Sequence, residues 1–127
     1  MTRPILDEHR IHPEIRDRIA RHHADIVGEV RAAIDTHDVV VIGMAQNPFP
    51  RKARQALAKA GIDCRYLEYG GYFSQWRRRN ALKMWTGWPT FPMIFVRGQL
   101  VGGAQDLEKL IASGELRTLL QAPRVSG

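Results

Sequence analysis

The chain has 127 residues, of which 44% are hydrophobic and 25% are charged, and it carries a formal net charge of +6. These values are typical of one globular domain and exclude a disordered or fibrous protein. No apolar run approaches the ~18 residues of a membrane span, and the N-terminus has no apolar signal core. We therefore expect a soluble, cytoplasmic protein.

The positive charge is concentrated in the middle of the sequence. Residues 51–83 contain nine Lys and Arg and two acidic residues, whereas residues 1–50 contain six Arg and eight acidic residues. This pattern indicates either a solvated positive face or an anionic partner, such as a small acidic ligand or an acidic protein surface. Nucleic acid is the less favoured partner, because the N-terminal part is acidic and no recognisable binding motif is present.

In chain order, the first predicted elements are an arm and a long helix. Residues 1–12 are polar and contain Pro4, which indicates a loose arm. Pro13 suits the first turn of a helix, and apolar residues recur at helical spacing to about Asp35. This stripe consists of Ile15, Ile19, Ile26, Val30 and Ile34.

The rest of the chain alternates strands and helices. A run of β-branched residues is typical of a strand buried on both faces, and Gly61 is a typical helix end. The predicted ranges are a strand over 39–42, a helix over 51–60, a strand over 62–69, a helix over 72–85, strands over 93–96 and 100–101, a helix over 105–112 and a short helix to residue 120.

This order of elements predicts an α/β fold with a mixed four-stranded sheet. The helical crossover makes the first two strands parallel, and the short connection between the last two makes an antiparallel hairpin. Helices flank the sheet, and an extra helix precedes it. The order is that of a thioredoxin-like fold.

Three segments have a distinctive sequence: Val39–Pro50 (VVVIGMAQNPFP), Trp88–Pro92 (WPTFP) and Leu100–Asp106 (LVGGAQD), which continues into Ser113–Leu116. Together they resemble glutaredoxins, and especially the monothiol branch of that family. The resemblance covers residues 36–120. We therefore expect an N-terminal arm and helix over 1–35, a glutaredoxin-like domain over 36–120 and a tail over 121–127.

Glutaredoxins carry a reactive cysteine where the first strand meets its helix, and the helix N-terminus stabilises the thiolate. The resemblance aligns this motif with Asn47, Pro48, Phe49 and Pro50. Asn47 then stands in place of the nucleophile, and an amide cannot attack a disulfide. The single cysteine, Cys64, excludes an internal disulfide and a cysteine-built zinc site. We expect it to be buried in the sheet and inert.

The resemblance also implies a groove for glutathione. The backbone before a cis-proline pairs with the cysteinyl part, basic residues on the third helix meet the glycine carboxylate, and a Gly-Gly turn followed by a helix N-terminus receives the γ-glutamyl carboxylate. Gln105 lacks the charge of the family's acidic residue, and Asp106 either replaces it or caps the helix. Met44 stands where the family has a lysine. The predicted ligand-binding residues are Arg79, Lys83, Thr90, Phe91, Pro92, Gly102, Gly103, Gln105 and Asp106.

We interpret the chain as a glutaredoxin-like protein that lacks the redox cysteine and binds glutathione, or a glutathionylated or protein ligand, in redox or iron–sulfur homeostasis. An iron–sulfur cluster is not expected, because it requires thiolate ligands. Nor is a metal site, because Pro13 interrupts a helix through His9 and His12. Two alternatives stay open. One is an oxidoreductase or glutathione transferase in which Asn47 orients the glutathione thiol, and the other is a protein-interaction module.

Overall fold

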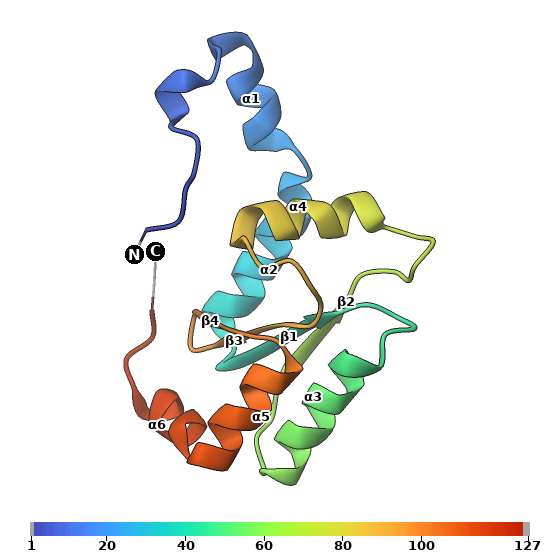
Figure 1. Cartoon of the computed structure of the whole chain (residues 1–127), viewed down its shortest axis with the longest axis vertical. Helices are drawn as coiled ribbons and strands as arrows, with labels where there is room; N and C mark the ends of the chain where they lie inside the picture. Colours follow the sequence, from blue (N-terminus) through green and yellow to red (C-terminus); the bar gives the residue numbers. More distant parts are fainter. Residues whose placement is uncertain (1, 126–127) are drawn as a thin grey trace.

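The structure is a computed structural model that describes residues 2–125, and it contains one mixed sheet with helices on both faces (Figure 1). No helix within these residues is long and apolar enough to cross a membrane. The strands are β1 (Val39–Gly43), β2 (Arg65–Glu68), β3 (Met93–Val96) and β4 (Gln99–Gly102). The helices are the 3₁₀ turn η1 (Glu8–Arg10), α1 (Pro13–Arg21), α2 (Ala24–Thr36), α3 (Pro48–Lys59), α4 (Trp76–Thr86), α5 (Ala104–Ser113) and α6 (Glu115–Gln121).

The strands lie in the order β2-β1-β3-β4. β1 is parallel to β2 and antiparallel to β3, and β3 and β4 form an antiparallel hairpin. Every residue of β1 is buried, as expected for a β-branched central strand that is covered on both faces. The predicted mixed four-stranded sheet with flanking helices is confirmed.

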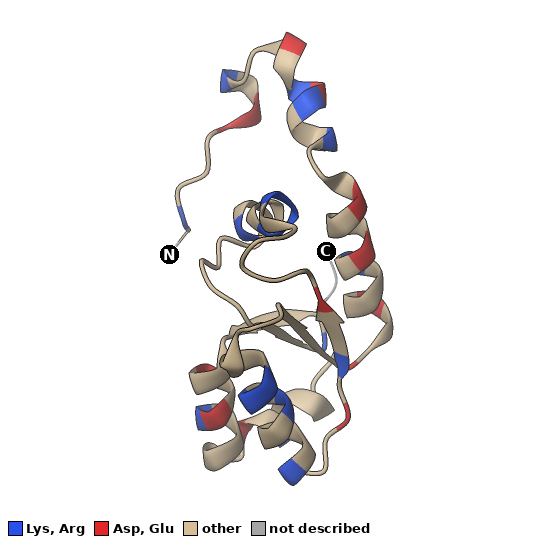
Figure 2. Cartoon of the chain, turned by 90° about the vertical axis from the view of Figure 1, so that its right-hand side faces the viewer, with Lys and Arg blue, Asp and Glu red and all other residues tan. Residues whose placement is uncertain are grey.

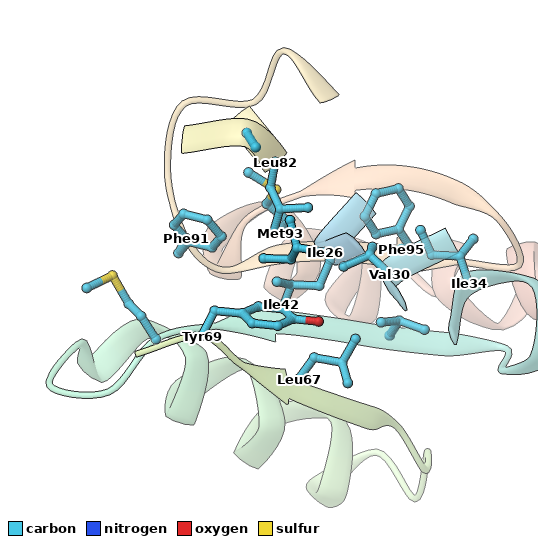
Figure 3. Packing of buried hydrophobic residues seen from close by; sticks show 13 residues of the cluster. Ile26, Val30, Ile34, Ile42, Leu67, Tyr69, Leu82, Phe91, Met93 and Phe95 are labelled. Carbon is cyan, nitrogen blue, oxygen red and sulfur yellow. The ribbon is translucent and has the colours of Figure 1, made fainter. Parts of the chain in front are cut away.

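Two apolar clusters lie on opposite faces of this sheet. α2 and α4 cover one face, where Ile26, Leu82 and Met93 are fully buried (Figure 3). α3, α5 and α6 cover the other face, where Leu57 and Leu107 are fully buried. A fully buried side chain of this size stabilises the fold by about 1.5–3 kcal/mol. The clusters therefore fix the helices, and with them the loops at the end of β1.

The predicted single helix over 13–35 is wrong. The structure contains two helices, α1 and α2, separated at His23, which adopts a left-handed conformation with φ 48°. The apolar stripe continues through both helices, but its residues on α2 are buried whereas Ile15 and Ile19 on α1 are exposed. Only α2 lies on the sheet, so α1 has no core to pack against and the chain can change direction between them.

Other boundaries shift by a few residues. α3 begins at Pro48, earlier than predicted, because the Asn47 side chain caps it. β2 and α4 both begin later than predicted. The C-terminal tail contacts the domain, since the Val125 N–H donates to the Arg97 carbonyl at 2.9 Å. Residues 126–127 of the predicted tail lie outside the described residues.

Candidate functional site

A groove with a volume of about 540 Å³ lies where β1 ends. It is bordered by the β1–α3 loop, the loop before β3, the N-terminus of α5 and side chains from the α4 region. Its lining residues are Met44, Asn47, Pro48, Phe49, Tyr72, Lys83, Trp88, Pro89, Thr90, Phe91, Pro92, Gly103, Ala104, Gln105 and Asp106. Most of the site residues predicted from the sequence therefore meet here, and three of them, Pro50, Arg79 and Gly102, do not line it.

Asn47 joins two walls of this groove. Its Oδ1 accepts a hydrogen bond from the Phe49 N–H at 3.0 Å, which caps α3. Its Nδ2 donates to the Phe91 carbonyl at 3.2 Å. Both ends of the amide are thus engaged, and the side chain ties the loop before β3 to the start of α3.

The Phe91–Pro92 peptide bond is cis, as the resemblance implies. The Phe91 side chain is buried, and the Lys83 ammonium lies 5.7 Å from the centre of its ring. This distance is within the range of a cation–π contact. Lys83 therefore supplies a positive charge on the α4 side of the groove, next to the backbone of Phe91.

The N-terminus of α5 forms another wall. The Gly103 N–H donates to Asp106 Oδ2 at 2.9 Å, so Asp106 caps the helix, which is one of the two roles considered from the sequence. Gly102 has a φ of 115°, and a Cβ at this position would collide with the Asp106 carboxylate. The absence of a side chain at Gly102 thus leaves space for the Asp106 carboxylate, although Gly102 itself does not line the groove. The exposed Gln105 side chain lies at the surface of the groove.

Arg79 differs from its predicted role of meeting a ligand carboxylate. The residue is 6% exposed, and its Nη1 donates to the carbonyls of Tyr69 and Ser74. Burial lowers the pKa of its guanidinium. Arg79 therefore fastens α4 to the preceding loop, and Lys83 alone of the two predicted cations reaches the groove.

Comparison with known proteins settles the family. A model of the glutaredoxin family matches residues 39–101. A glutaredoxin-like protein of Dictyostelium discoideum is 44% identical over 102 residues, which cover 80% of this chain and 83% of that protein. The chain belongs to the glutaredoxin family. A probable monothiol glutaredoxin of Legionella pneumophila is 31% identical over 78 residues, covering 61% of this chain and 84% of that protein.

A solved structure gives the same result for the fold. Oxidized glutaredoxin 2 from Chlamydomonas reinhardtii matches with a TM-score of 0.66 and 28% identity, covering 78% of this chain and 94% of that one. This glutaredoxin therefore has the predicted thioredoxin-like fold.

The one cysteine of this glutaredoxin lies far from the groove along the sheet. Cys64 precedes β2 and so lies beside the start of β1, whereas Asn47 follows the end of β1. Burial raises the pKa of the Cys64 thiol, so little of it is the reactive thiolate near neutral pH. The expected burial within the sheet is wrong in detail, because Cys64 precedes β2 and is only half-buried against the core. That the thiol is inert stays a prediction.

An iron–sulfur cluster, which monothiol glutaredoxins can carry, does not fit the residues of this groove. Such clusters require thiolate ligands, and no cysteine lines the groove. Within residues 2–125, no three His, Cys, Asp or Glu side chains are grouped in a way that could hold a metal ion.

Tyr72 is a lining residue that becomes clear only in the structure, and the structure also shows where the predicted Pro50 lies. Tyr72 lines the groove because its N–H donates to Gln46 Oε1 at 3.0 Å, which brings the loop before α4 to the β1–α3 loop. Pro50 is buried against the end of β1, where a Cβ on Gly43 would come within 2.7 Å of the proline ring. No pattern in the sequence indicates the Tyr72 contact, since it joins residues from separate loops.

Proposed function

We propose that this glutaredoxin binds glutathione in the groove without carrying out thiol–disulfide exchange. Glutaredoxins bind glutathione, and the groove has the cis-proline loop and the helix N-terminus described above. The observation that carries the proposal is Asn47, whose amide occupies the capping position of α3 and bonds to Phe91. The place aligned with the family's nucleophile thus holds a neutral side chain that has no thiolate form.

The arrangement supports an extended tripeptide along the groove. The Phe91 carbonyl has two lone pairs, and Asn47 uses one, so the other can accept from the cysteinyl N–H. Lys83 is the cation for the glycine carboxylate, and the first-turn N–H groups of α5 suit the γ-glutamyl carboxylate. Because Asp106 is used as a cap, the γ-glutamyl ammonium meets the uncharged Gln105. Binding should therefore be weaker than in a groove with two cations and a free carboxylate.

Exchange chemistry requires a thiolate that attacks a disulfide sulfur. Cys64 is half-buried away from the groove, and its raised pKa keeps it protonated. We infer a protein that holds glutathione or a glutathionylated protein in cytoplasmic redox or iron–sulfur homeostasis. An enzyme that activates the glutathione thiol through Asn47 is less favoured, because both ends of that amide are already bonded.

Calorimetric titration with reduced and oxidised glutathione tests the proposal. Lys83→Gln should weaken binding by about tenfold or more, the value of a hydrogen bond to a charged group. Lys59→Gln is the matched control, because Lys59 ends α3 away from the groove. No detectable binding at millimolar glutathione would contradict the proposal.

A turnover assay separates the binding protein from the enzyme. Wild-type protein should reduce glutathione-linked disulfides no faster than Cys64→Ala. Turnover that disappears in Cys64→Ala would identify Cys64 as the nucleophile. Turnover that persists in this variant would instead support activation of bound glutathione.

A second candidate function, docking of an acidic protein segment, is favoured by a cation–aromatic rim beside the groove. The rim consists of Phe49, Lys52, Tyr72, Phe73, Trp76 and Arg77. Phe73 is 94% exposed. Lys52 Nζ and Arg77 Cζ each lie 5.1 Å from the centre of an aromatic ring of the rim. Aromatic residues and Arg are the residue types that dominate binding at protein interfaces.

A photo-crosslinking residue placed at position 73 tests this second function. We expect crosslinks to a protein whose identified contact segment is acidic, and we expect Arg77→Glu to remove them. Crosslinks that persist in Arg77→Glu would contradict docking through charge at this rim. Glutathione affinity should be the same in both chains, because Arg77 does not line the groove.

A further inference from the structure

The segment before β1 lies outside residues 39–101, which match the family. Figure 2 shows this segment as an arch, with the arm, α1 and α2 around α4, which is seen nearly end-on. Arg3 Nη1 donates to the Thr86 carbonyl at 2.8 Å and so fastens the arm to the end of α4. Neither η1 nor α1 contains a buried residue. The apolar side chains of α1 are therefore not explained by the core of the domain, unlike those of α2.

A second groove, of about 650 Å³, lies between this arch and α4. Ile19 of α1, Val27 of α2 and Trp85 of α4 line it, with Gly28 between them. Ile19 and Met84, which also line it, are 53% and 64% exposed. The groove is thus a concave apolar surface whose side chains water covers in the free protein.

The charge of this groove has one sign. Arg31 lines it and no Asp or Glu does. In the part of the chain that the structure describes, Arg31 forms no ion pair. An unpaired guanidinium beside an apolar surface suits a carboxylate or a similar anionic head group, which it can bind through two parallel hydrogen bonds.

We propose that this groove binds a small amphiphilic anion, with an apolar body over Ile19 and Met84 and one anionic head group on Arg31. The volume falls within the ~300–1,000 Å³ of small-molecule sites, which are mostly apolar with a few polar groups. Trp85 stacks on the core residue Phe95 with ring centres 6.4 Å apart, so one wall is already held in place.

A small molecule fits this surface better than a protein does. Protein interfaces carry about one hydrogen bond per 100–200 Å², spread over roughly 800 Å² on each partner. This groove offers one guanidinium and the ring of His22 as polar lining side chains. One guanidinium can bind one anionic head group. It cannot supply the several hydrogen bonds that the polar rim of a protein interface contains.

Fluorescence titration with anilinonaphthalene sulfonate, an aromatic apolar anion, tests the proposal. We expect saturable binding of one dye per chain and competition by decanoate. Gly28→Leu should remove this binding, because a Cβ at Gly28 meets nothing within 4 Å and a larger side chain would extend into the groove. Leu is also a good helix former, so thermal unfolding should show that the variant is folded.

Arg31→Gln separates the head group from the body of the ligand. It should weaken binding of the sulfonate dye by about tenfold and leave binding of the neutral analogue N-phenylnaphthylamine unchanged. Phe73→Ala and Lys83→Gln are the controls, because they alter the exposed rim and the glutathione groove; both should bind the dye as wild type does. The result thus does not depend on glutathione binding.

Three outcomes would overturn the proposal. Dye binding by folded Gly28→Leu equal to that of wild type would place the dye elsewhere. Equal loss of charged and neutral dye in Arg31→Gln would mean that the guanidinium recognises no head group. A wild-type dimer that Gly28→Leu converts to a monomer in light scattering would make the groove an interface between two copies of this chain.

Discussion

Two grooves of the molecule share the helix α4 and are built in different ways. α4 contributes Lys83 to the groove at the end of β1, where we propose that glutathione binds, and Trp85 to the groove under the N-terminal arch. The first groove is made of loops and helix ends, so it presents backbone N–H and carbonyl groups. The second is made of the faces of three helices, whose backbone groups are bonded within the helices, so it presents side chains.

The two grooves should therefore respond to different kinds of substitution. Backbone groups recognise a peptide-like ligand whatever side chains carry them, so the first groove can bind glutathione, as we propose, with Phe91 and Gln105 at its contacts. Helix faces recognise a ligand only by shape, apolar area and isolated charges. The first groove should therefore respond to changes in polar chemistry, and the second to changes in volume.

The largest expected change is a gain of thiol chemistry in Asn47→Cys. The new thiol would lie at the N-terminus of α3, where N–H groups and the helix dipole stabilise a thiolate. Its pKa should fall well below the free value of ~8.5, whereas burial raises the pKa of Cys64. The two thiols of one chain then differ, and the pH dependence of alkylation, followed by mass spectrometry of each peptide, measures both.

Asn47→Cys should also form a mixed disulfide with oxidised glutathione at position 47. The control is Asn47→Ser, which keeps a capping side chain but has no thiol. If the thiol at position 47 titrates no lower than Cys64, the groove does not have the electrostatics of a glutaredoxin site. Docking of an acidic protein would then become the favoured function.

The next largest effect concerns stability. Arg79→Ala would leave the carbonyls of Tyr69 and Ser74 without their donor. A buried group left unsatisfied costs about 1–3 kcal/mol, so urea denaturation should show a loss of about 2–3 kcal/mol. Arg77→Ala is the matched control on the same helix. Because the Arg77 side chain is exposed, the change in the free energy of unfolding should stay within about 0.5 kcal/mol.

Glutathione binding by folded Arg79→Ala should be close to that of wild type, since Arg79 does not line the groove. If Arg79→Ala instead keeps its stability and loses glutathione affinity, the carboxylate contact expected from the sequence would be the correct role. The pair of measurements thus assigns Arg79 either to the fold or to the ligand.

The case of Arg79 shows why the fold was more predictable than the site. Residues 79 and 83 are four apart, which places both on one face of a helix, and the resemblance implied the same role for both. The direction of a long side chain depends on which acceptors lie within reach. Here the loop before α4 offers the Tyr69 carbonyl at 2.8 Å from Arg79 Nη1, and no pattern in the sequence specifies that loop.

The N-terminal segment illustrates the same limit for secondary structure. The β-branched run of β1 predicted its strand correctly because both its faces are buried, so the run itself carries the signal. The stripe from Ile15 to Ile34 predicted a single helix because periodicity reports which residues share a face. Periodicity does not report how many residues of that face have a sheet to pack against. Here α2 packs on the sheet and α1 does not.

The smallest expected effect is an increase in stability that tests whether the second groove is open. Gly28 and Gly61 each have room for a Cβ, with nothing within 4 Å, but Gly61 has a φ of +73° whereas Gly28 lies within α2. Gly28→Ala should therefore stabilise the protein by about 0.5–1 kcal/mol through helix propensity. Gly61→Ala should destabilise it by about 1 kcal/mol, because the left-handed region disfavours a side chain. Urea denaturation of both variants measures the contrast. A loss of stability in Gly28→Ala would mean that α1 and α4 close over Gly28 in solution, leaving no room for a ligand.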